Sequence, residues 1–529
     1  MKYKIIIVFL LGTLFSNAQN FDAEAYKLTR MLGMIDNFYV DTVDKKSLVE
    51  DAIVAMLKDL DPHSVYISED EVKRMNEPLQ GSFDGIGVQF NILNDTLMVV
   101  SPIAGGPSEK LGIQAGDRIV IIDGDTVAGV GLQNSTVVKK LRGKKGTKVV
   151  VDIVRQGEKE LLQFEIIRDK IPIYSLDAAY MISDNTGYIK LNRFAATTMN
   201  EFNKAVDSLK KSGFENLILD LRGNGGGYLR TAIALADEFL KDGQLVVYTE
   251  GVHQPKQTYN ATSQGSFNKG RVIVMVDEGS ASASEIVSGA IQDWDRGLVM
   301  GRKTFGKGLV QRPFNLPDGS MVRLTVARYY TPAGRCIQKS YEKGAEDYAE
   351  DLLHRYNNGE LTNADSIHFP DSLKYETLTK KRTVYGGGGI MPDVFIPLDT
   401  TKKMTDYYLK IRRKGVVYQF LVAYMDKHRD ELKKEYPDFN TFRTDFKVDD
   451  KMFADIKKAS EKKEIEPKDS TEYEDSKKDI ELVVRALLAR DIWNTSEFYQ
   501  IFNEIDEGLL DAVEIISDKK KYEARFKKK

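Results

Sequence analysis

From about residue 22 to residue 76, apolar side chains recur at steps of three and four, the spacing of one face of an α-helix. The first stripe consists of Leu28, Met31, Leu32, Ile35 and Phe38, and the second of Leu48, Ile53, Met56, Leu57 and Leu60. Pro62 then interrupts the pattern, because proline lacks the N–H that a helix interior needs. The pattern predicts a helical segment over residues 19–80.

From Gly81 to about Arg168 the pattern changes to short apolar runs between glycine turns. It predicts strands at 97–100 and 148–155, a turn, strand and turn over 115–124, and helices at 107–111 and 135–141. We expect a small β domain over residues 81–170.

Strand-like and helix-like segments then alternate up to about residue 400, which predicts a sheet covered by helices. Within this region the charged stretch 340–383 is expected to be loop-like. Residues 401–529 form a charged helical extension, in which the lysine- and glutamate-rich run 457–479 is interpreted as a solvated linker or an exposed helix.

The first residues have the pattern of a secretory signal over residues 1–18. Lys2 and Lys4 precede a short apolar stretch, and Ser16-Asn17-Ala18 is a small-x-small cleavage site. The apolar stretch is short for a membrane span, although a retained anchor is the alternative. We expect an exported protein, most naturally periplasmic, with secretion or envelope association as alternatives.

Composition narrows the function classes. A net charge of −3 argues against nucleic acid as the main partner. Cys336 is the only cysteine, so an intramolecular disulfide is excluded. The five histidines show no metal-ligand spacing, and we expect neither a metal nor a cofactor.

Three motifs carry chemistry, and the first surrounds Ser282. A buried strand at 271–276 runs into the small-residue turn Ser280-Ala281-Ser282-Ala283-Ser284, and an apolar helix follows to about Trp294. A serine at a helix start lies beside unpaired N–H groups. A serine- and alanine-rich helix cap is the alternative.

The second motif places Lys307 between two glycines, which allow close approach to another backbone. A lysine that loses solvation has a lowered pKa, and its neutral amine can activate a serine. A turn or phosphate loop is the alternative, but Gly308 stands where a Walker sequence has Ser or Thr.

The third motif is the glycine run that follows the strand at 216–221 and ends at Gly227. Its N–H groups can stabilise a developing oxyanion. A tight turn is the alternative, and the dinucleotide spacing GxGxxG is absent.

Together these motifs resemble the carboxy-terminal processing peptidases, also called tail-specific proteases. The matching stretches read LDPHSVYIS, FDGIGV, AGDRIVIIDG, LDLRGNGGG, GSASASEIVSGAIQD, TFGKGLVQ, LTVARYYTPAGR and GGIMPDV. They cover about residues 22–337 and 385–398. The resemblance implies an α/β core of the crotonase-like (ClpP-like) type, with an inserted PDZ domain, an N-terminal helical segment and a C-terminal helical extension.

The resemblance also implies roles for single residues. Ser282 would be the nucleophile, Lys307 the general base and Gln311 the residue that orients the lysine. The oxyanion hole would combine the N–H of Ala283 with that of one of two glycines, Gly226 and Gly227. Asp293 and Glu285 match acidic positions of the family motif, with a structural role as the alternative.

The 81–170 segment resembles a PDZ domain, in which a glycine loop holds a peptide's terminal carboxylate and the peptide extends a sheet. Here that loop would be Gly85-Ile86-Gly87-Val88. The implied partners are proteins with exposed apolar C-termini. Whether the domain restrains or activates the protease stays open, as does the role of the extension: docking an adaptor, self-association or covering the core.

Two other functions are weaker. A Ser–His–Asp protease with a PDZ domain does not fit, because the PDZ-like segment precedes the serine and no GNSGG or GDSGG occurs. A catalytically dead scaffold is disfavoured because Ser282 and Lys307 are both present. We therefore expect an exported serine endopeptidase that cleaves peptide bonds through an acyl-enzyme.

Overall fold

The computed structural model of the protein describes residues 23–400 and 404–527, and the predicted signal segment 1–18 lies outside them. The chain divides into two compact units. One comprises the residues up to Glu69 with Arg312–Thr325, and the other comprises Asp70–Gln311 with the residues from Val326 onward.

The first unit contains two helices and a short strand that pairs with a hairpin tip. These are α2 (Ala23–Phe38), α3 (Lys45–Lys58) and β1 (Val65–Ile67). β1 is antiparallel to the start of β18 (Met321–Tyr330). The predicted helices are present, but α2 has no buried residue and Phe38 is 84% exposed. The apolar stripe on α2 is therefore not a core face within this unit.

The second unit begins with α4 (Glu69–Gln80) and the small β domain. The strand β2 (Ser82–Gly85) comes before this domain in sequence and β9 (Asp169–Pro172) comes after it. The two strands pair as an antiparallel ribbon. Its sheet has the order β3-β4-β5-β7-β8, with β6 on β5. Its remaining elements are β3 (Val88–Leu93), β4 (Thr96–Pro102), α5 (Pro107–Lys110), β5 (Arg118–Ile122), β6 (Asp125–Thr126), α6 (Asn134–Leu141), β7 (Lys148–Val154) and β8 (Leu162–Ile167).

The centre of the second unit is a six-stranded sheet in the order β10-β11-β12-β15-β16-β21. Only the β10–β11 pair is antiparallel. The strands are β10 (Leu176–Ser183), β11 (Thr186–Leu191), β12 (Asn216–Asp220), β15 (Val272–Val276), β16 (Leu298–Gly301) and β21 (Val394–Phe395).

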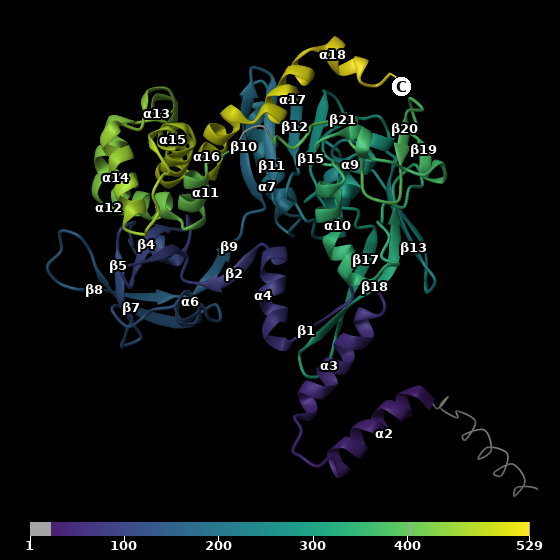
Figure 1. Cartoon of the computed structure of the whole chain (residues 1–529), viewed down its shortest axis with the longest axis horizontal. Helices are drawn as coiled ribbons and strands as arrows, with labels where there is room; N and C mark the ends of the chain where they lie inside the picture. Colours follow the sequence, from purple (N-terminus) through teal and green to yellow (C-terminus); the bar gives the residue numbers. More distant parts are fainter. Residues whose placement is uncertain (1–22, 401–403, 528–529) are drawn as a thin grey trace, which may run out of the picture. The chain divides into compact units, whose positions relative to one another are not determined.

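Both faces of this sheet are buried, as is usual for parallel strands. Along β12, Leu217 and Leu219 join one apolar cluster while Ile218 joins another, because side chains alternate between faces. The first cluster includes α7 (Thr198–Lys210), α8 (Leu229–Asp237) and α9 (Ala283–Asp293). The second is closed by α17 (Glu507–Ser517) and α18 (Lys519–Ala524), and Figure 1 shows α17 beside these strands. The end of the C-terminal extension thus completes the core.

A second sheet follows the order β18-β13-β14, with β17 paired to β18. Its other strands are β13 (Leu245–Gly251), β14 (Gln254–Asn260) and β17 (Leu309–Asn315). The stretch 340–383 is not loop-like as predicted, because it contains α10 (Ala345–Asn357), two 3₁₀ turns (Ala364–Ser366 and Asp371–Leu373) and the β19 (Lys374–Glu376)–β20 (Thr383–Tyr385) ribbon.

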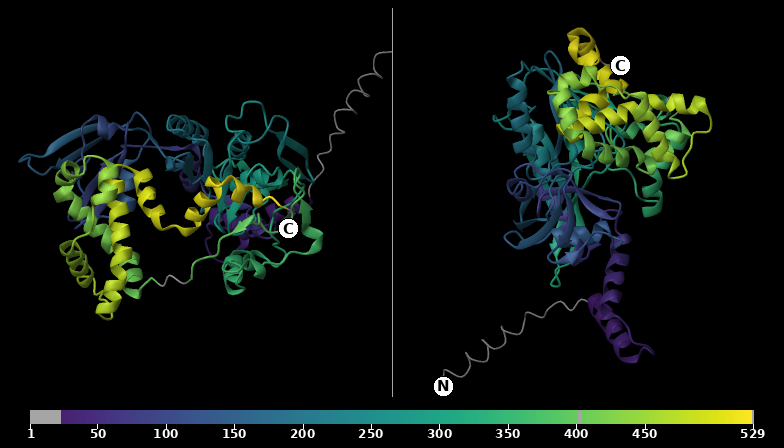
Figure 2. Two further views of the ribbon diagram at one scale, coloured as in Figure 1. Left: turned by 90° about the horizontal axis from the view of Figure 1, so that it is seen from above. Right: turned by 90° about the vertical axis from the view of Figure 1, so that its left-hand side faces the viewer.

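The rest of the extension forms a helical bundle with its own core (Figure 2). Ile411, Phe442 and Val484 are fully buried in it. The predicted run 457–479 is mostly helical and largely exposed. The helices are α11 (Asp406–Arg413), α12 (Val416–Glu435), α13 (Phe439–Asp445), α14 (Asp450–Glu461), α15 (Ser470–Ile492) and α16 (Thr495–Phe502). Across residues 23–400 and 404–527, no helix combines the length and apolarity needed to cross a membrane.

Candidate active site

Ser282 lies at a sharp turn between a buried strand and a buried helix. β15 ends at Val276, and Ser282 is the residue before α9. Its backbone has φ 55° and ψ −108°, a conformation that residues with a side chain rarely adopt. Such strain costs about 1–3 kcal/mol and persists where the surrounding structure holds it. The half-buried Ser282 is thus presented at a helix N-terminus.

Lys307 and Gln311 lie together, as predicted. The Lys307 Nζ donates to Gln311 Oε1 at 3.0 Å. The flanking glycines permit close packing of the loop: a Cβ at Gly308 would lie 2.8 Å from the backbone nitrogen of Gln338. The loop that carries Lys307 is therefore pressed against other backbone segments.

Glu285 joins the serine turn to the lysine loop. Its Oε2 accepts the N–H of Ser282 at 2.8 Å and that of Lys307 at 2.9 Å. Its Oε1 accepts the Thr304 hydroxyl at 2.6 Å and the Gly306 N–H at 2.7 Å. Burial raises the pKa of Glu285, although these four donors oppose the shift. The predicted acidic residue is thus a cross-link at the site.

Tyr329 is a second cross-link, and the residue patterns did not single it out. Its hydroxyl donates to the carbonyl oxygen of Lys307 at 2.5 Å and to that of Ser282 at 3.1 Å. Burial raises its pKa well above the ordinary value, so the hydroxyl stays a donor. The stretch LTVARYYTPAGR contains it, but the sequence does not say which tyrosine reaches the site.

The glycine run after β12 lies against Ser282. A Cβ at Gly226 would come within 3.0 Å of both the Ser282 Cβ and the Ala283 nitrogen. However, the Gly226 N–H already donates to Asn224 Oδ1 at 2.9 Å. Gly227 forms a parallel bridge with Phe194 through the Gly226 carbonyl and the Tyr228 N–H. In that pattern the Gly227 N–H points away from Phe194 and takes no part in the bridge.

The neighbouring serines Ser280 and Ser284 have a structural role. Ser280 Oγ donates to the Leu221 carbonyl and Ser284 Oγ to the Asn224 carbonyl, each at 2.8 Å. Both side chains are fully buried. They tie the glycine run to the serine turn, and Ser282 is the one serine of the three that is not fully buried.

Asp220 anchors the strand that leads into the glycine run. Burial alone raises its pKa, but the charges of Arg222 and Lys190 and hydrogen bonds from Arg222 and Tyr188 outweigh burial and hold the pKa well below its usual range. Arg222 also pairs with Asp506 at 2.8 Å, at the start of α17. The extension therefore contacts the base of the glycine run.

Asp293 lies at the other end of α9 from Ser282. It pairs with the fully buried Arg335 at 2.5 Å and accepts the Ala333 N–H at 2.8 Å. A helix of this length separates its ends by about 16 Å. Asp293 is thus structural, whereas Glu285 belongs to the site.

The predicted carboxylate loop precedes an edge strand of the β domain. The Ile86 carbonyl accepts Ser108 N–H and Oγ–H, and the Gly87 carbonyl accepts the Ile103 N–H at 2.8 Å. Because C=O and N–H point oppositely across a trans peptide, the N–H groups of Gly87 and Val88 face away from these partners. Among the described strands β3 pairs only with β4, so its outer edge can accept a peptide.

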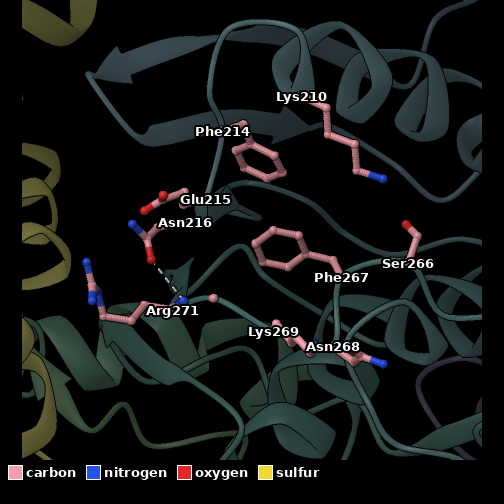
Figure 3. A pocket seen from close by; sticks show the side chains of 10 residues that line it. Lys210, Phe214, Glu215, Asn216, Ser266, Phe267, Asn268, Lys269 and Arg271 are labelled. Atoms are coloured by element: carbon pink, nitrogen blue, oxygen red, sulfur yellow. Dashed lines mark hydrogen bonds between the residues drawn. The ribbon is translucent and has the colours of Figure 1, made fainter.

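A pocket of about 630 Å³ lies elsewhere (Figure 3). It is lined by Asn216 and Arg271, at the start of β12 and just before β15, and by the stacked rings of Phe214 and Phe267. Ser282 follows the opposite end of β15, so this pocket is not the site of the serine and the lysine. Within the described residues no group of three or more His, Cys, Asp or Glu could hold a metal ion.

Comparison with protein families gives four matches. Peptidase family S41 matches residues 185–347, a PDZ domain residues 85–166, and the N-terminal domain of the activating protease CtpB residues 14–71. A family of unknown function matches residues 407–494, which correspond to the helical bundle.

The similar curated proteins are consistent with the peptidase family match. The chain is 36% identical to carboxy-terminal processing protease CtpA of Bacillus subtilis over 61% of this chain and 68% of the relative. It is 36% identical to carboxy-terminal processing protease CtpB of the same organism, over 60% of this chain and 66% of the relative. A solved PDZ domain of carboxy-terminal protease from Vibrio cholerae, in complex with peptide, is 33% identical, covering 17% of this chain and 97% of that one, with a TM-score of 0.16. The chain belongs to peptidase family S41, as a serine-type carboxy-terminal processing protease with a PDZ domain.

Proposed function

We propose that this protein is an exported endopeptidase that selects substrates by their C-terminal tails and cleaves peptide bonds with Ser282 and Lys307. The observation that carries the proposal is the Glu285 carboxylate, whose single oxygen Oε2 binds the backbone N–H groups of Ser282 and Lys307 at 2.8 and 2.9 Å. This arrangement supports a serine and a base held as one unit.

In the proposed reaction the neutral Lys307 amine takes the proton of Ser282 Oγ as this oxygen attacks the scissile carbonyl carbon. The N–H groups of Ala283 and Gly227 stabilise the resulting oxyanion. The Lys307 ammonium then gives its proton to the leaving amine, and an acyl-enzyme remains. Water attacks the ester carbonyl while Lys307 accepts its proton. The Lys307 ammonium then returns that proton to Ser282 Oγ as the ester C–O bond breaks, which releases the new C-terminus and restores both groups. Gln311 keeps the Lys307 Nζ directed during these transfers.

The PDZ domain would hold the substrate's terminal carboxylate on the N–H groups of Gly87 and Val88 and pair its last residues with the edge of β3. The orientation of the loop and the open edge support this role. Export is part of the proposal, and N-terminal sequencing of the mature protein should begin at Gln19. An intact Met1 on protein recovered from the soluble cytoplasmic fraction of its native cell would contradict export alone.

Cleavage of casein by purified variants tests the catalytic proposal. Ser282→Ala and Lys307→Ala should each abolish cleavage while leaving the circular dichroism spectrum unchanged, because nucleophile and base act together. Ser288→Ala is the matched control, because this buried hydroxyl only bonds the Ser284 carbonyl within α9. A Ser282→Ala protein that digests casein at the wild-type rate would reject the assignment. Tail binding without cleavage by the wild type would favour a scaffold.

A further inference from the structure

The insertion at 340–383 contacts the loop that carries Lys307. Arg355 of α10 is only 3% exposed. Its Nη2 donates to the carbonyl oxygen of Lys303 at 2.5 Å, and its Nη1 donates to that of Thr304 at 3.2 Å. A planar guanidinium therefore holds two consecutive carbonyl groups of the loop, a geometry that arginine provides and lysine does not.

Two further contacts hold the loop to the insertion. Glu360 pairs with the Lys303 Nζ at 2.6 Å, just after α10 ends. The Phe305 ring packs edge-on against the Tyr348 ring of α10, with 6.0 Å between centroids. The insertion thus contacts three consecutive residues of the loop, from Lys303 to Phe305.

Thr304 links this contact to the reacting groups. The residue is fully buried, and its carbonyl is bound by Arg355 while its hydroxyl donates to Glu285 Oε1 at 2.6 Å. The other oxygen of Glu285 holds the N–H of Ser282 and of Lys307. A displacement of Thr304 would therefore be transmitted to the carboxylate that sets the serine against the lysine.

We propose that Arg355 is a positioning residue for Lys307, and that the 340–383 insertion thereby sets the rate of the chemical step rather than the affinity for substrate. The inference rests on the proposed Ser282–Lys307 mechanism. Without the guanidinium, the buried carbonyl of Thr304 and the part-buried carbonyl of Lys303 lose this donor, and the loop relaxes toward other partners.

The test compares Arg355→Met and Arg355→Lys with the wild type on a peptide that has a free apolar tail. The readouts are kcat, KM and the pH at which the alkaline rise of kcat/KM is half complete. Arg382→Met is the matched control, because Arg382 is another buried arginine of the insertion whose ion pairs are with Asp295 and Asp393. Thermal unfolding and near-ultraviolet circular dichroism show which variants are folded.

The pH readout reports on the Lys307 loop for a specific reason. Apart from Arg355, the titratable groups that contact residues 303–308 are Glu285 of α9, Tyr329 of β18, Lys339, Tyr348 of α10 and Glu360. All five remain in Arg355→Met, as do Lys303 and Lys307 of the loop. Arg355→Met also removes a positive charge, whereas Arg355→Lys keeps it, so a midpoint that moves in Arg355→Lys as well reflects an altered setting of the existing groups.

For Arg355→Met we expect kcat to fall on the order of a hundredfold, the loss typical of a misplacement of about 1 Å. We expect KM to stay within about twofold, because the contact is remote from the tail site. The alkaline midpoint should move, and Arg355→Lys should recover part of the lost kcat. Arg382→Met should lower the melting temperature without moving the midpoint.

A folded Arg355→Met protein with wild-type kcat and midpoint would overturn the inference, and so would an equal change of midpoint in Arg382→Met. If Arg355→Met does not fold, Arg355→Lys takes its place. A folded Arg355→Lys protein with wild-type kcat and midpoint, or an equal change of midpoint in Arg382→Met, would then overturn the inference. Ser282→Ala assayed in parallel separates the two hypotheses. If it is inactive while Arg355→Met is normal, only the positioning role fails, whereas its full activity would reject the dyad itself.

Discussion

The backbone N–H groups of Ser282 and Lys307 donate to the same oxygen atom, Oε2 of Glu285, at 2.8 and 2.9 Å. The Tyr329 hydroxyl bridges the carbonyl oxygens of the same two residues. The serine turn and the lysine loop are therefore joined through the backbone N–H groups and through the carbonyl oxygens of Ser282 and Lys307. The relative position of the serine and the lysine is a property of this small buried network.

Glu285→Gln should lower kcat/KM about a hundredfold, the scale of loss expected from a small misplacement of reacting groups. A side-chain NH₂ would face two of the four donors that the carboxylate now accepts, at a cost of about 1–3 kcal/mol per unmade hydrogen bond. Steady-state kinetics and urea unfolding measure both effects. Glu278→Gln, which removes a partly exposed partner of Arg302, is the control and should change kcat/KM little. Wild-type kcat in Glu285→Gln would show that the cross-link is dispensable.

Ser282→Gly should be more stable to unfolding than Ser282→Ala by about 1 kcal/mol, although both should be inactive. At φ 55° and ψ −108° an alanine retains the strain of a Cβ, whereas glycine adopts this conformation readily. Urea unfolding of the two variants at one pH measures the difference. Equal stability, or a less stable glycine variant, would mean that the turn stores no strain.

Tail recognition predicts that cleavage depends on the last residue of the substrate. Amidation of a peptide with an apolar tail removes the charge held by the Gly87 and Val88 N–H groups, a bond worth about 1.5–3 kcal/mol. Affinity should therefore fall roughly ten- to hundredfold. Titration of the Ser282→Ala protein with the acid, the amide and a peptide ending in aspartate measures this. Equal affinity for all three would exclude tail recognition.

Asp220→Asn should lower the free energy of unfolding at neutral pH by about 1.5–3 kcal/mol, because Arg222 loses its buried charged partner and keeps only the partly exposed Asp506. The folded pKa of Asp220 lies below the unfolded value. Its contribution is therefore complete above the unfolded pKa of about 3.9 and is lost as pH falls through the folded pKa. Denaturant unfolding from pH 7 to pH 3 should show a constant difference that shrinks only below about pH 4. A difference that grows on acidification would contradict this.

The extension should stabilise the protease core through α17. Leu509 is fully buried against the central sheet, and its replacement by alanine should cost about 2–5 kcal/mol. Leu510, the next residue, is 48% exposed and serves as the control, with an expected change within about 0.5 kcal/mol for Leu510→Ala. Thermal unfolding monitored by circular dichroism compares them. Equal effects of the two substitutions would show that the helix does not pack on the sheet in solution.

Much of this protein is determined by local sequence. The strands predicted at 97–100 and 148–155 and the helix predicted at 135–141 match β4, β7 and α6, because side-chain alternation and backbone sterics act over a few residues. Ser282 and Lys307 could be singled out for the same reason: a small-residue turn before a helix and a lysine between two glycines are short patterns with direct chemical consequences.

Two segments show what such local patterns cannot predict: the helix α2 and the insertion at 340–383. Periodicity predicts that α2 is a helix, but its apolar face is exposed within its unit, since periodicity does not specify a partner surface. The charged stretch 340–383 suggested a loop, yet it contains α10, whose Arg355 is buried against the lysine loop. A charged side chain is buried only where the fold supplies acceptors, and those acceptors belong to another segment.

The sequence by itself thus determined the class of protein, and it singled out Ser282 and Lys307 as the proposed reacting pair. Only the tertiary structure decided that Glu285 rather than Asp293 belongs to the site, that Tyr329 bridges its two halves, and that α17 covers one face of the sheet. Each of these depends on contacts between residues far apart in the chain. Such contacts form because the packed core brings their segments together, and no short sequence pattern records them.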